Sequence, residues 1–152
     1  MRPLVSALRR VTSLFLLAFF AVGLSSCSSS ESLNPVTGKV LYKGQAAAGA
    51  LVSFHPEGAA SVNSRTATAI TDSEGVFWLS TGDKKGAAPG KYIVTVVYFD
   101  PAKRPNDKQR MQGATDADAP DLLGGRYATR DKSTQKAEVK SGENKLEPFD
   151  LK

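Results

Sequence analysis

Residues 89–99 read PGKYIVTVVYF, and this stretch decides the fold. Alternate residues of a β-strand point to opposite faces of its sheet. Both faces of this stretch are apolar, which is typical of a strand covered on both sides. We therefore expect residues 91–99 to form a central strand, with one set of side chains on each face: Tyr92, Val94, Val96 and Tyr98 on one, and Ile93, Val97 and Phe99 on the other.

Shorter alternating stretches, separated by Gly, Pro and Asp turns, lie on both sides of this strand. No window of eleven residues after Asn34 has helical periodicity, so the mature chain is predicted to be all-β. Regular spacing with polar turns favours a seven-stranded β-sandwich over residues 34–152. The other six strands are expected at 36–42, 50–55, 66–71, 76–80, 135–140 and 145–152, with Asp72 to Gly75 turning the chain into the fourth.

Residues 1–26 are expected to be a secretory signal peptide and not part of this fold. Arg2, Arg9 and Arg10 supply a basic start, and residues 11–24 form an uncharged, mainly apolar run. That run has 14 residues, fewer than the roughly 20 that span a bilayer core. A retained membrane anchor and a twin-arginine signal are the weaker alternatives.

Cys27 is the only cysteine, and it stands directly after this run. The sequence Leu24-Ser25-Ser26-Cys27 resembles the lipobox of bacterial lipoproteins. The resemblance implies a diacylglyceryl group on the Cys27 thiol, cleavage between Ser26 and Cys27, and a fatty acyl group such as palmitate on the new amine. It predicts an exported protein held by lipid on a membrane, and Ser28 leans toward the outer membrane by the same resemblance. An ordinary signal with a spare thiol is the alternative.

Residues 27–33 are rich in serine and are expected to be a flexible tether between the lipid and the domain. After the signal peptide, 17 basic and 15 acidic side chains remain, a net charge of +2. This near-balance argues against a nucleic-acid partner. A single cysteine excludes a disulfide within the chain, so the hydrophobic core must hold the domain together.

Three motifs resemble the carboxypeptidase regulatory-like domains: residues 36–40 followed by Gly44, residues 71–77, and residues 89–92. The closing segments 142–144 and 149–151 fit the same scheme. Together with the lipobox, the chain resembles the small transthyretin-like lipoproteins abundant in planctomycetes. The resemblance covers about residues 35–152 and implies a prealbumin-like sandwich, related in shape to transthyretin and immunoglobulin-like domains. The hydroxyisourate hydrolases of that fold use several histidines and a distinctive C-terminal tetrapeptide, and both are missing in this chain.

Residues suited to catalysis or metal binding are few. His55 is the only histidine and is expected on a polar strand face, so no catalytic residue and no cofactor are predicted. Asp116, Asp118 and Asp121 are weak candidates for calcium, because their spacing matches no EF-hand and a solvated acidic turn explains them. They belong to the long polar segment 100–134, whose length is unusual for a simple connection.

The aromatic side chains could in principle stack on a sugar, although aromatics at alternate strand positions more often belong to the core. They are Trp78, Tyr92, Tyr98 and Tyr127, the last of which we expect to pack on the sandwich after Gly124-Gly125. The sequence thus predicts a lipid-anchored, non-catalytic cell-envelope protein with a structural or binding role. The partner would be an envelope protein or a polysaccharide. A carbohydrate- or calcium-binding accessory module is the alternative.

Overall fold

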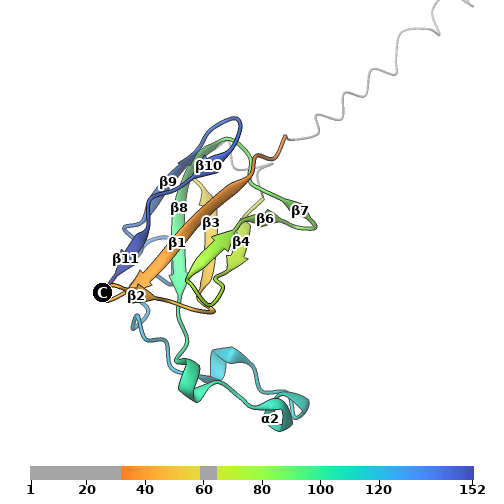
Figure 1. Ribbon diagram of the computed structural model, residues 1–152, viewed down its shortest axis with the longest axis vertical. Coiled ribbons are helices and arrows are strands. Elements are labelled where there is room, and N and C mark those ends of the chain that lie inside the picture. Colours follow the sequence, from red (N-terminus) through yellow and green to blue (C-terminus); the bar gives the residue numbers. More distant parts are fainter. Residues whose placement is uncertain (1–31, 59–64) are drawn as a thin grey trace, which may run out of the picture. The chain divides into compact units, whose positions relative to one another are not determined.

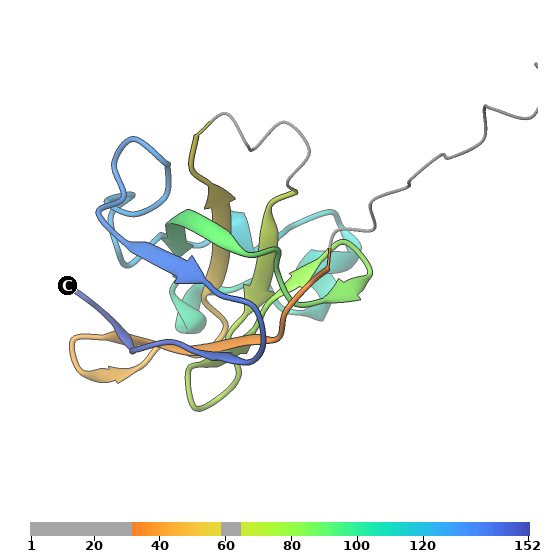
Figure 2. The same cartoon turned by 90° about the horizontal axis from the view of Figure 1, so that it is seen from above.

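The computed structural model describes residues 32–58 and 65–152, so the predicted signal peptide, the Ser26–Cys27 cleavage site and most of the tether lie outside the described residues. The described part is an all-β sandwich, as expected, with a single α-helix of five residues. Its strands form two sheets, which Figure 2 shows as two layers, with β1 and the C-terminal strand apart from β3, β4 and β8.

The five-stranded sheet is built around β1, which pairs with every other strand of that sheet. Two of these pairings, with β10 and β11, are parallel, and two, with β2 and β5, are antiparallel. The strands are β1 (Val36–Tyr42), β2 (Gln45–Ala46), β5 (Val76–Trp78), β10 (Asn144–Lys145) and β11 (Phe149–Leu151).

The six-stranded sheet has the order β7-β6-β4-β3-β8-β9 and is antiparallel throughout. The predicted central strand is β8, which lies between β3 and β9, one place from the edge. The strands are β3 (Leu51–Pro56), β4 (Ala67–Ile70), β6 (Ser80–Thr81), β7 (Lys84–Lys85), β8 (Gly90–Val97) and β9 (Lys136–Val139).

The described residues contain eleven strands where the sequence predicted seven. The difference is largest after the turn at Asp72, where the expected strand 76–80 divides into β5 and β6. The Leu79 amide donates to Val36 of β1 in one sheet, and its carbonyl accepts from Gly86 on the other side. The chain therefore passes from one sheet to the other at Leu79, whose side chain is buried between them.

The Asp72–Gly75 turn forms as predicted. One Asp72 carboxylate oxygen accepts from the amides of Glu74 and Val76, each at 2.9 Å, as expected of an aspartate that bonds its own turn. Gly75 has φ +76°, and a Cβ there would lie 2.5 Å from the Val40 carbonyl oxygen. Only glycine fits, because it tolerates the left-handed region and has no side chain to collide with β1.

Four aromatic rings meet at the centre of the core. Phe54 of β3 lies 5.8–6.3 Å, centroid to centroid, from the rings of Phe77, Tyr92 and Phe149. Phe77 also covers Gly38 of β1, where a Cβ would lie 2.6 Å from the ring. The core cluster lies wholly between Val36 and Leu151, so a fragment starting at residue 28 contains the complete core.

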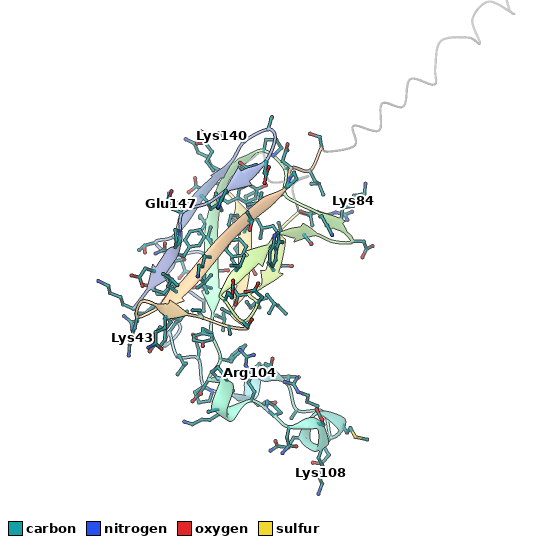
Figure 3. The ribbon with its side chains drawn as sticks, in the orientation of Figure 1. Lys43, Lys84, Arg104, Lys108, Lys140 and Glu147 are labelled. Atoms are coloured by element: carbon teal, nitrogen blue, oxygen red, sulfur yellow. The ribbon has the colours of Figure 1, made fainter. Side chains whose placement is uncertain are left out.

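Residues 100–118 project from the end of the sandwich where β8 finishes, opposite the end where β1 begins (Figure 1). They contain two 3-10 turns, η2 (Pro101–Lys103) and η3 (Asp116–Asp118), and helix α2 (Asp107–Met111). Arg104 holds the root of this projection by donating to the carbonyls of Gly49 and Phe99 (Figure 3). The long segment is thus without strands, as predicted, and forms defined turns.

Residues 119–135 return along β8. Leu123 is fully buried, and the carbonyls of Tyr127 and Gln135 accept from the amides of Val96 and Val94. Tyr127 packs against the core, which confirms the role predicted for it. The outer face of β8 is only partly covered, since Thr95 is buried while Ile93 and Val97 are half-buried.

Candidate functional site

His55 lies on the outer face of β3 and is half-buried. Its Nε2 is 3.0 Å from the Thr95 hydroxyl, and its Nδ1 is 3.5 Å from the Thr66 hydroxyl. Partial burial, together with the positive charge of Arg130, lowers the pKa of His55 below its ordinary value of 6.5. No carboxylate among the described residues hydrogen-bonds the ring, so the orienting group of a nucleophile–histidine–acid triad is missing there.

The three candidate calcium ligands do not converge. Asp116 forms an ion pair with Arg110, and Asp118 accepts from the Thr115 amide at 2.7 Å. Asp121 accepts from the backbone amides of Tyr98, Leu123 and Gly125, at 2.8–3.1 Å. Within residues 32–58 and 65–152, no group of three or more histidine, cysteine, aspartate or glutamate residues could hold a metal ion.

Two of the four candidate stacking aromatics are core residues, and a third, Tyr127, packs against the core. Tyr92 and Tyr98 are buried, and the Tyr92 hydroxyl donates to the Ala88 carbonyl at 2.7 Å. Trp78 differs, because 62% of its surface is exposed. Tyr127 is half-buried against the core, so Trp78 is the one of the four that is mainly exposed.

A groove lies on the outer face of the five-stranded sheet, next to Trp78, which pairs with one of its lining residues but does not line it. Trp78 pairs with Thr37 of β1, and Thr37 pairs on its other side with Lys145 of β10. Directly paired residues of neighbouring strands lie on the same face. The groove has a volume of about 330 Å³ and is lined by Thr37, Gly38, Lys39, Val76, Lys145, Leu146, Glu147 and Pro148.

The groove exists because β10 and β11 do not form one continuous strand. Val36 and Thr37 pair with Asn144 and Lys145, whereas Val40 pairs with Phe149. One more residue separates Lys145 from Phe149 than separates Thr37 from Val40. The Leu146 amide still donates to the Thr37 carbonyl at 2.9 Å, so the break in pairing with β1 falls at Glu147 and Pro148. Pro148 has no backbone N–H to give to the ladder, which suits a break in pairing.

The charges beside this groove have no ion-pair partners among the described residues. The ion pairs of the described residues join Lys103 to Asp100, Arg110 to Asp116 and Lys136 to Glu57, all away from the groove lining. Lys39, Lys145 and Glu147 belong to none of them. Figure 3 labels Glu147 on the C-terminal stretch that borders the groove.

A second, shallower hollow of about 250 Å³ lies at the edge of the six-stranded sheet, beside β9. Its two lysines and two glutamates balance: the Lys136 ammonium is 2.7 Å from a Glu57 carboxylate oxygen, and Lys91 lies opposite Glu138 in the pairing of β8 with β9. The first groove has two lysines and one glutamate, so its unbalanced positive charge makes it the better candidate for a charged external ligand.

Sequence reasoning named Trp78 but missed Lys39, Lys145 and Glu147. Lys39 and Lys145 fall on the polar positions of alternating strands, where a lysine is ordinary. Their common location depends on the parallel pairing of β1 with β10, between residues more than a hundred positions apart. The only available signal was that Trp78 shares a face with Val76, opposite to Phe77 and Leu79.

The fold and this groove together define a class: an all-β sandwich domain with a small, charged, surface-exposed site beside one tryptophan. No protein-family model, curated protein or solved structure matches the chain.

Proposed function

We propose that this protein is an exported lipoprotein, held on a membrane of the cell envelope by lipid on Cys27, with a structural or binding role and no catalysis. The observation that carries the proposal is the lipobox-like sequence ending at Cys27, placed seven residues before the first residue of the fold, Asn34, which bridges to Ala87. Seven residues reach at most about 25 Å, so the lipid would keep the domain close to the membrane surface.

Lipid chemistry supports a lasting attachment. Each buried methylene contributes about 0.8 kcal/mol, and two or more acyl chains hold a protein stably where one holds it only marginally. Within residues 32–58 and 65–152, no helix is long and apolar enough to cross a membrane.

The proposed non-catalytic role is supported by how the candidate residues are used. His55 contacts threonine hydroxyls, and Asp72 and Asp121 bind the backbone amides of their own turns. These contacts position backbone and neighbouring side chains. The geometry does not favour the calcium-binding alternative, since Asp116, Asp118 and Asp121 each make separate local contacts.

Replacing the cysteine tests the anchor. We expect Cys27→Ala to move the protein from the membrane fraction to the soluble fraction, and Ser28→Ala, the adjacent control, to leave it in membranes. Mass spectrometry of the N-terminal peptide should show fatty acyl groups on Cys27. Membrane partitioning of Cys27→Ala, or an unmodified thiol in the wild-type protein, would refute the proposal.

A further inference from the structure

The surface around Trp78 combines an aromatic ring, two lysine ammonium groups and a glutamate carboxylate. The ring and the lysines lie in two neighbouring rows of paired residues that run across the five-stranded sheet. One row is Trp78, Thr37 and Lys145, and the next begins with Val76 and Lys39. Single exposed apolar side chains are common on protein surfaces and mean little alone. Here the exposed tryptophan is paired with Thr37, which lines the groove, and follows Val76, another lining residue, on the same face of β5. The two lysine ammonium groups of the groove have no ion-pair partner in the described part of the chain.

The charge balance of the groove favours an anionic ligand. Lys39 and Lys145 outnumber Glu147. Lys145 is paired with Thr37, and Lys39 follows Thr37 by two residues on the same face of β1. The Thr37 hydroxyl is already used, because it donates to the Phe77 carbonyl at 3.0 Å. The polar groups left for a ligand are therefore two cationic donors and one carboxylate acceptor.

We propose that this groove binds an acidic polysaccharide, with uronic-acid residues as the recognised units. One sugar unit would occupy the groove, and the flat C–H face of a neighbouring unit would lie against Trp78, whose indole offers a large apolar surface next to the groove. The sugar carboxylate would pair with Lys39 or Lys145, and a sugar hydroxyl would donate to Glu147. The groove volume of about 330 Å³ lies at the lower end of small-ligand sites, so it fits one unit of a longer chain.

This inference rests on the binding role proposed above and not on the lipid anchor. It can therefore be tested on the fragment 28–152, which lacks Cys27 and contains the complete core. Trp78 is the only tryptophan of the chain, so intrinsic fluorescence reports on this site alone. The probes are an oligogalacturonate, a neutral galacto-oligosaccharide of equal length and sodium sulfate.

We expect the oligogalacturonate to change the Trp78 fluorescence in a saturable manner, with binding weakened by added salt. The neutral oligosaccharide should bind at least tenfold more weakly, and sulfate should leave the spectrum unchanged. Lys39→Gln combined with Lys145→Gln should weaken oligogalacturonate binding at least tenfold. The matched control, Lys84→Gln with Lys85→Gln on the exposed strand β7, removes the same charge and should stay within twofold of wild type.

Trp78→Ala, followed by calorimetry, should also weaken binding at least tenfold, while circular dichroism should show an unchanged fold because the side chain is exposed. Three outcomes would each overturn the proposal: no response to oligogalacturonate, equal binding of the neutral oligosaccharide, or equal losses in the β7 control. Membrane fractionation of Cys27→Ala tests the lipid anchor independently of ligand binding. Failure of the proposed binding site and failure of the proposed anchor are therefore distinguishable.

Discussion

Asp121 provides the sharpest test of how the long segment is held. One of its carboxylate oxygens accepts from the amides of Tyr98 and Leu123, at 3.1 and 3.0 Å. The other accepts from the Gly125 amide at 2.8 Å. These bonds join the end of β8 to the returning chain, just before the fully buried Leu123. Asp121→Ala removes both acceptor oxygens and with them all three hydrogen bonds.

The loss in the free energy of unfolding caused by Asp121→Ala follows from those three hydrogen bonds. A hydrogen bond to a charged group contributes about 1.5–3 kcal/mol, and a donor left without a partner adds its own penalty. The site is only part-buried, and water would replace some of the lost bonds, so we expect Asp121→Ala to lower the free energy of unfolding by about 2–4 kcal/mol. In Asp121→Asn, an amide NH₂ would face the Gly125 N–H, and we expect a loss of about 1–2 kcal/mol.

Urea unfolding of the fragment 28–152, followed by far-ultraviolet circular dichroism, measures these changes. Asp107→Ala is the matched control, because Asp107 lies in the same segment and is exposed on α2; its cost should stay below about 0.5 kcal/mol. If Asp121→Ala unfolds at the same urea concentration as wild type, the carboxylate does not hold the segment. If calcium raises the midpoint of wild type but not of Asp121→Ala, the residue is a metal ligand instead.

Three further changes test the core, the turn and the histidine. Phe54→Ala, at the centre of the aromatic cluster, should cost about 3–5 kcal/mol in urea unfolding. Gly75→Ala should destabilise the domain by at least about 2 kcal/mol, because it adds both left-handed strain and a contact with the Val40 carbonyl; a thermal midpoint equal to wild type would contradict this. Since the pKa of His55 is lower in the fold than in the unfolded chain, stability should be fully present above pH 6.5 and fall as the pH drops below it. The wild-type minus His55→Gln difference in unfolding free energy, measured at pH 7.5 and 5, should shrink at the lower pH.

The sequence predicted the faces of the strands well, because burial imposes a period of two that residues reveal directly. Val36, Val40, Val52, Phe54 and the alternate residues from 92 to 98 are all buried as expected. The strand 36–42 was also correct at both ends. Where apolar and polar side chains alternate strongly, the residues of the strand themselves are enough to locate it in the sequence.

Pairing partners were not local and could not be predicted. Residues 76–80 read as one strand because Phe77 and Leu79 share a face, yet the two ends of this stretch belong to different sheets. Likewise, alternation shows that Trp78 and Phe77 point to opposite faces but not which face is covered. The groove depends on both facts, so only its tryptophan could be named in advance.

The order of strands around β1 also sets when the domain can close. The strand β1 pairs with segments more than a hundred residues later in the sequence, since Val40 to Tyr42 pair with Phe149 to Leu151. Contacts between residues so distant in sequence form late and slow down folding. Residues 149–151 must therefore be synthesised before the sandwich can close, an order of events that would suit the proposed export, in which a chain crosses a membrane before it folds.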